Sequence, residues 1–292
     1  MTRARLVNAF AFLDGPDPAV ERRRADGFLT VFLIVFGTEY VVRAIPKWPD
    51  LPIPYTVSVA LIMALSVAGL RRAWRRTAFL GLAAVHLHVL WLEFPGSANH
   101  AYLELFICLL GAFLDVEHPE ERRHLLRAAR WLTCLVLFYS GLAKVVHGYW
   151  FHGEMLAHQL KFSYYRPVLG LLLPGTEFER LVAFTAQVGD GPYRVENLPF
   201  VVVSNAVYLL EMGLAVLLAV RRTRPVAVLP ALALTVAIEA GAREFFFGLV
   251  FGNALLLFTR RDTNTPARWP VAAILALLVA IRLGLVGRIH FT

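Results

Sequence analysis

Long apolar runs recur along the whole 292-residue sequence and are separated by short polar connections. A helical segment needs about 20 apolar residues to cross the hydrocarbon core of a bilayer, and a soluble domain seldom contains many runs approaching that length. Hydrophobic side chains make up 58% of the chain. The pattern therefore predicts an all-α fold, a polytopic integral membrane bundle, and argues against a soluble protein.

The length criterion predicts about nine transmembrane helices. We expect a cytoplasmic lead-in over 1–26, a transmembrane domain over 27–286 and a C-terminal tail over 287–292. The predicted spans are 27–44, 54–70, 77–93, 100–115, 127–147, 198–220, 225–241, 245–259 and 269–286.

Basic side chains gather in every second connection between these spans, and the formal net charge is +8. Cytoplasmic loops of membrane proteins carry such an excess of Lys and Arg. This rule predicts an integral cell (inner) membrane protein with a cytoplasmic N-terminus and an external C-terminus. It also explains the charge without a nucleic-acid partner. The basic clusters lie at 22–24, 71–76, 122–130, 221–224 and 260–268.

The one long connection, 148–197, falls on the external side in this arrangement. It contains apolar pieces such as "GEMLAHQLKF" and "TEFERLVAFTAQV", each too short to cross a bilayer. We expect interfacial or re-entrant helices here, forming a cap over a cavity. Cys108 and Cys134 lie in apolar runs without a metal-binding or disulfide spacing, so neither a zinc site nor a disulfide is expected.

Polar side chains at membrane depth are costly unless they face protein or water, so their positions indicate where a cavity lies. Most of them fall at predicted helix ends on the external side, where a shared cavity would collect them. The candidates are Glu39, Arg43, Glu93, Asn99, His100, Tyr102, Glu104, Lys144, His147, Trp150, Glu211, Glu239 and Arg243.

Each candidate also has a structural interpretation. Lys144 and Arg43 fit cations that extend from helix ends to the interface. His147 and His152 are five residues apart, a poor spacing for a metal pair on one helix face, and no metal is expected. Glu211 lies deep in "NAVYLLEMGLAVLL" and needs a partner, for which we consider Asn205, Arg243 or a proton.

Two stretches carry a resemblance to a known family. "ANHAYLELFICLLGAFLDVEH" (98–118) resembles the Asn-His-x-Tyr-Leu helix of the HTTM superfamily, which includes the vitamin K-dependent γ-glutamyl carboxylase, and "FYSGLAKVVHGYWFHGEML" (138–156) is similar to its Gly-x-x-Lys helix end. The resemblance covers roughly 20 to 260, and the order of the later helices agrees with it. The large luminal domain of the carboxylase has no counterpart, so a Glu-containing protein substrate is not expected.

The resemblance implies a catalytic role for Lys144, as the base that deprotonates a reduced quinone of the vitamin K hydroquinone type. It implies that His100 hydrogen-bonds the quinone oxygen or an oxyanion and that Asn99 orients it. The carboxylase carries two adjacent lysines here and uses the second, whereas Val145 follows Lys144 in this chain. Its seventh helix carries Phe-His where this chain has Ile238 and Glu239.

Three functions therefore remain open. The first is a membrane-embedded enzyme, with carboxylase-like lyase or quinol-dependent oxidoreductase chemistry, that binds a lipid-soluble quinone among membrane lipids. The second is a non-enzymatic scaffold for export or immunity that binds a neighbouring membrane or secreted protein. A transporter is less well supported, because no pair of interrupted helices recurs in two halves of the sequence.

Overall fold

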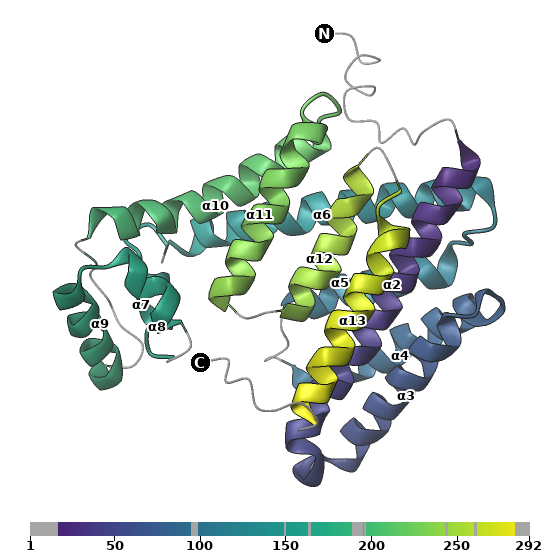
Figure 1. The fold of residues 1–292 in the computed structure, drawn as a ribbon, viewed down its shortest axis with the longest axis horizontal. Coiled ribbons are helices and arrows are strands. Elements are labelled where there is room, and N and C mark those ends of the chain that lie inside the picture. Colours follow the sequence, from purple (N-terminus) through teal and green to yellow (C-terminus); the bar gives the residue numbers. More distant parts are fainter. Residues whose placement is uncertain are drawn as a thin grey trace. The chain divides into compact units, whose positions relative to one another are not determined.

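The computed structural model describes residues 17–94, 99–148, 150–162, 165–188, 195, 197–242, 245–259 and 262–283 (Figure 1). The side chains at 47–49, 99–100, 184–188, 239–242 and 281–282 also lie outside this description. The described residues form helices joined by turns, with no strand among them. The predicted all-α class is confirmed, whereas most of the lead-in and the whole C-terminal tail lie outside the described residues.

Each predicted membrane span coincides with a helix. The first helix begins earlier than predicted because the Asp17 carboxylate accepts a 2.8 Å hydrogen bond from the Ala19 N–H, an N-cap that precedes Pro18 at the first helical position. The helices are α2 (Pro18–Ala44), α3 (Ile53–Gly69), α4 (Arg75–Glu93), α5 (Asn99–Phe113), α6 (Pro119–His147), α10 (Leu198–Ala219), α11 (Arg224–Ala242), α12 (Phe245–Leu255) and α13 (Asn264–Arg282).

Three of these helices, α2, α6 and α10, are long and apolar enough to cross a membrane. The remaining predicted spans form helices that are shorter or less apolar in the described part of the chain. The structure is thus compatible with a membrane protein. Nine crossings, and the sides on which the termini lie, stay predictions.

The contacts divide the chain into two units, which are described separately. Unit 1 comprises Met1–Thr133 and Phe245–Phe291, and unit 2 comprises Cys134–Glu244. In unit 1, α2 packs against α3, α12 and α13, and Figure 1 shows α13 running alongside α2. Gly27 permits this approach, because a Cβ there would lie 2.7 Å from the Thr265 backbone nitrogen. Phe28, Phe32, Phe36 and Phe79 fill the fully buried core.

The basic connections of unit 1 gather around the N-terminal end of α2. Asp26 accepts hydrogen bonds from Arg75 at 2.5 Å and from Arg72 at 3.2 Å, which ties the α3–α4 connection to α2. The α5–α6 and α12–α13 connections join the same end through ion pairs. Within unit 1 these connections therefore lie at one end of the helices, while their cytoplasmic position stays a prediction. The further ion pairs are Arg22–Glu117, Arg123–Glu21 and Arg23–Asp262.

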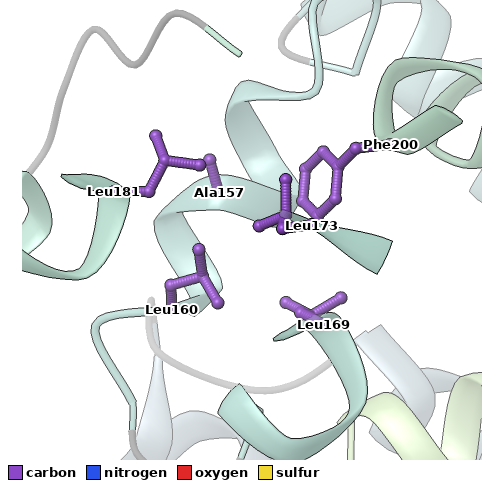
Figure 2. Packing of buried hydrophobic residues seen from close by; sticks show 6 residues of the cluster. All are labelled: Ala157, Leu160, Leu169, Leu173, Leu181 and Phe200. Atoms are coloured by element: carbon purple, nitrogen blue, oxygen red, sulfur yellow. The ribbon is translucent and has the colours of Figure 1, made fainter. Parts of the chain in front are cut away.

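In unit 2, the long connection folds into short helices, as the sequence predicts. They are α7 (Glu154–Gln159), α8 (Arg166–Leu169), the 3-10 helix η3 (Gly170–Leu172) and α9 (Gly175–Val188). They share a hydrophobic cluster with the start of α10, shown in Figure 2. This cluster attaches the short helices to a membrane-length helix, while their interfacial position stays a prediction. Its buried members are Ala157, Leu160, Leu169, Leu173, Leu181 and Phe200.

Candidate functional site

Helix α6 ends in a turn at Gly148. Gly148 adopts φ +73°, a left-handed conformation that glycine accepts without strain, and its N–H donates to the Lys144 carbonyl at 3.2 Å. Helix α10 holds the turn: the Ser204 hydroxyl donates to the Trp150 carbonyl at 2.7 Å and the Asn205 amide to the Phe151 carbonyl at 3.0 Å. Trp150 is therefore fixed over the last turn of α6.

The C-terminal part of α6 approaches α10 very closely at Gly141. A Cβ at this position would lie 2.6 Å from the Met212 side chain and 2.8 Å from the backbone oxygen of Tyr208. Residues three apart lie on the same face of a helix. The close contact at Gly141 consequently brings Lys144, one turn later, against the same region of α10.

Lys144 forms a bidentate ion pair with Glu211. Its Nζ lies 2.8 Å from Oε1 and 2.7 Å from Oε2 of the carboxylate, and it also donates to the Ser140 hydroxyl at 2.8 Å. The Ser140 hydroxyl in turn donates to Glu211 Oε1 at 3.2 Å. The side chain of Glu211 is only 3% exposed and that of Lys144 is 18% exposed. The carboxylate is therefore buried, whereas the lysine side chain is partly exposed.

The structure gives Glu211 a partner, Lys144, that the sequence did not suggest. Asn205 uses its amide for the carbonyls of Phe151 and Val201 and its Oδ1 to accept from Tyr208, so it does not serve Glu211. Arg243 lies outside the described residues. Glu211 is instead paired with Lys144 of α6. This ion pair explains why a carboxylate is tolerated so deep in α10.

The open side of Lys144 carries an aromatic surface. Its Nζ lies 5.2 Å from the centroid of the Trp150 ring, within range of a cation–π interaction. Next to it, Phe151 packs edge-on against Tyr208 with ring centroids 5.8 Å apart. An ammonium, a buried carboxylate and an indole face thus occur together at the end of α6.

A second buried polar cluster lies in unit 1. Glu39 forms an ion pair with Arg43 and lies within hydrogen-bonding reach of Glu104. His86 Nε2 is 3.7 Å from Glu104 Oε2, and His86 Nδ1 is 2.8 Å from the Tyr40 hydroxyl. The sequence placed Glu39, Arg43 and Glu104 near one side of the membrane, and the structure brings them together. It adds His86, which periodicity alone marks only as a buried position on α4.

Glu93 lies beside this second cluster and accepts a hydrogen bond from the Tyr55 hydroxyl at 3.3 Å. Asn99 and His100 form the first turn of α5 and Glu239 belongs to α11, but their side chains lie outside the described residues, as does all of Arg243. Tyr102 is 42% exposed, and His147 is exposed at the end of α6. A shared cavity for Lys144 and His100 remains a prediction.

The fold and the two clusters define an all-helical chain with membrane-length helices and buried ionisable groups. A comparison of the chain with protein-family models, with curated protein sequences and with solved structures finds no match.

Proposed function

We propose that the chain is an HTTM-like integral membrane protein, similar to the vitamin K-dependent γ-carboxylase, and that it moves a proton from a quinol-like, lipid-soluble ligand through Lys144. The observation that carries the proposal is the Lys144–Glu211 ion pair, buried on the carboxylate side and partly exposed on the amine side. Three membrane-length helices support a place in the bilayer.

The residues around Lys144 suit an aromatic ligand with an acidic hydroxyl. The Trp150 ring offers a flat apolar surface beside the Lys144 amine, and an ammonium is a strong donor to a ligand oxygen. A reduced quinone would supply a hydroxyl proton and, afterwards, reducing electrons. The side chains of this chain would bind the ring, orient the hydroxyl and take up the proton.

Glu211 gives Lys144 a way to act as a base even though the pair is charged. Lys144 can pass one of its protons to a Glu211 oxygen, 2.7 Å away, while it takes the proton of the ligand hydroxyl. The net result is one proton on Glu211, an ammonium on Lys144 and a negative ligand oxygen beside it. A low-dielectric site strengthens the attraction between that oxygen and the ammonium. In this scheme Lys144 and Glu211 are catalytic residues and Trp150 is a binding residue.

A test uses the full chain in lipid nanodiscs and a 1,4-naphthohydroquinone with an isoprenoid tail, kept under argon. Ionisation of the bound hydroxyl is followed by absorption, and binding is followed by quenching of tryptophan fluorescence. We expect Glu211→Gln to keep binding within a few-fold and to lose ionisation, because the proton has no acceptor. Lys144→Met should lose ionisation as well. Unchanged ionisation in both variants would contradict the proposal.

The alternative is a non-enzymatic scaffold in which the ion pair only joins α6 to α10, and the close approach at Gly141 favours this second candidate. Exchanging the two residues, Lys144→Glu together with Glu211→Lys, separates the hypotheses. An attachment that is purely structural is restored by the exchange, and so is every function that depends on it. Proton transfer needs the amine beside Trp150, and the exchange moves the amine to position 211. If the proposed function is right, the exchanged variant should regain stability but should not ionise the hydroquinone.

A further inference from the structure

The polar cluster of unit 1 uses none of the residues assigned to proton transfer in unit 2. It is built from the C-terminal part of α2, the start of α3, the C-terminal half of α4 and the first turns of α5. Its buried carboxyl groups face a permanent cation, Arg43, only from α2, and face tyrosine, histidine, glutamate and cysteine side chains from the four helices. The titratable groups that face the Glu39–Glu104 pair are Tyr40, Arg43, Tyr55, His86, Glu93 and Cys108.

The two carboxyl groups at its centre are almost completely buried. Glu39 is 1% exposed and Glu104 is 2% exposed, and the two groups are within hydrogen-bonding reach of each other. The Oε1 atom of Glu104 receives no hydrogen bond from a donor in the part of the chain that the structure describes. Ionised carboxylates are acceptors only, so two of them in contact repel. They attract each other only when one of them carries a proton.

The charges around the pair balance with one proton present. Arg43 forms an ion pair with Glu39, which accounts for one negative charge. A second carboxylate at Glu104 would leave a buried negative charge without a permanent cation, and an uncompensated buried charge is strongly unfavourable. Protonation of the pair removes this charge and supplies the missing donor.

The contacts of His86 are complete without a positive charge on its ring. Its Nε2 is 2.7 Å from the carbonyl oxygen of Ala101, which can only accept, so Nε2 carries a hydrogen. In the neutral ring, Nδ1 accepts from the Tyr40 hydroxyl, which lies 2.8 Å away. Both ring nitrogens are satisfied in the neutral form, whereas Glu104 Oε1 lacks a donor among the described residues, and this difference favours the carboxyl pair as the place of the proton.

The surroundings give the pair one open side. The Phe36 ring lies edge-on to His86, with centroids 5.0 Å apart, and edge-on to Tyr40 at 5.3 Å, and Phe32 stacks against Phe36. These rings close the inner end of the cluster with apolar surface. At the other end the Arg43 side chain is 40% exposed, so the group next to Glu39 extends to the molecular surface.

We propose that the Glu39–Glu104 carboxyl pair is a binding site for a single exchangeable proton, reached from the Arg43 end of α2. A group of this kind can give a proton to, or take one from, chemistry at the surface where Arg43 emerges. The inference does not depend on the function proposed for Lys144, because it uses different residues.

Infrared difference spectroscopy on the full chain in lipid nanodiscs tests the site at neutral pH. A protonated carboxyl group gives a carbonyl stretching band that an ionised one lacks, and this band shifts when D2O replaces water. We expect such a band in the wild type and its loss in both Glu104→Gln and Glu39→Gln. The control Glu93→Gln, which alters a neighbouring carboxylate bonded to Tyr55, should retain it. A band unchanged in both pair variants would overturn the proposal.

Thermal unfolding of the same variants completes the test. A glutamine amide has nearly the shape of a protonated carboxyl group and offers a donor at the same place. Glu104→Gln should therefore keep the wild-type melting temperature within a few degrees at neutral pH, whereas Glu104→Ala should lower it clearly. Failure of both glutamine variants to fold would contradict the proposal, since it would mean that the pair requires two ionised carboxylates.

Discussion

The amine of Lys144 lies 2.7 and 2.8 Å from the two carboxylate oxygens of Glu211, although 67 residues separate them in the sequence. The carboxylate is the more deeply buried partner, at 3% exposure against 18% for the lysine. Removing one partner of a buried pair leaves the other charge uncompensated, and the penalty depends on how far that charge can reach solvent. The two partners are therefore not equivalent.

Lys144→Met should destabilise the protein more than Glu211→Gln. The first change strands a buried carboxylate and is expected to cost about 3–5 kcal/mol, whereas the second leaves a lysine that extends toward the open side. Thermal unfolding in detergent measures the difference. Lys161→Met is the control, because it removes an exposed lysine of the same unit. Equal losses for the two variants would show that the pair is not asymmetrically buried.

The contact between α6 and α10 depends on the missing side chain at Gly141. An alanine Cβ there would meet the backbone of Tyr208 at 2.8 Å, so the helices must separate. We expect Gly141→Ala to cost about 1–3 kcal/mol by overpacking and to weaken the Lys144–Glu211 pair.

Gly213→Ala on α10 provides the matched control, since nothing lies within 4 Å of its added Cβ. Alanine favours a helix over glycine by up to about 1 kcal/mol, so this variant should melt at or slightly above the wild-type temperature. A wild-type melting temperature for Gly141→Ala would contradict the close approach.

The sequence predicts the helices well because their signals are local. Apolar runs indicate each helix, but they do not show the start of the first one, which Asp17 and Pro18 set before the predicted span. Pairing between helices is a different matter. Periodicity places Lys144 on the same face as Gly141, but it does not say that this face meets α10, because many apolar faces are interchangeable in packing. Gly141, one turn before Lys144, indicates that another helix approaches this face closely. The sequence does not identify that helix as α10.

The cluster around Glu104 shows the same limit more strongly. It joins Glu39 and His86 from two other helices, and each residue alone has an ordinary interpretation as a polar group at a helix end or a packing residue. Only their mutual distances distinguish a buried network from scattered side chains. The alternation of basic connections predicted that Glu39 and Glu104 lie near the same side of the membrane. It could not predict that the two side chains are in contact.

Two arginines hold the end of α12 in unit 1. Arg24 donates to the carbonyls of Leu257 and Thr259 at 2.5 and 2.6 Å, and Arg130 donates to Leu257 at 2.9 Å. These carbonyls lie within and just after the 3-10 helix η4 (Leu256–Phe258), which follows α12, and the carbonyls at a helix end are open to donors from outside the helix. Hydrogen bonds that involve a charged group contribute about 1.5–3 kcal/mol, so Arg24→Met or Arg130→Met should lower the melting temperature by several degrees.

Arg22→Met is the control for this pair of variants. Arg22 is 45% exposed and contacts the exposed Glu117, and such surface ion pairs contribute about 0–1 kcal/mol. Its melting temperature should stay close to that of the wild type. A loss as large as that of Arg24→Met would mean that charge, and not the carbonyl contacts, governs stability at this end of α2.

Cysteine labelling tests the predicted membrane arrangement at the α2–α3 pair. Asp50 ends the 3-10 helix η1 (Ile45–Asp50) after α2, and Arg71 follows α3, and both side chains are exposed. The native thiols Cys108 and Cys134 are free and buried, at 0% and 4% exposure, so their background is low. A membrane-impermeant maleimide on intact cells should label Asp50→Cys, whereas Arg71→Cys should react only after the membrane is permeabilised.

Two bilayer crossings within residues 18–69 require this opposite response of the two sites, and the basic connection at 71–76 is expected in the cytoplasm. Reversed labelling would invert the orientation, and labelling of both sites from one side would show that α3 does not cross the bilayer.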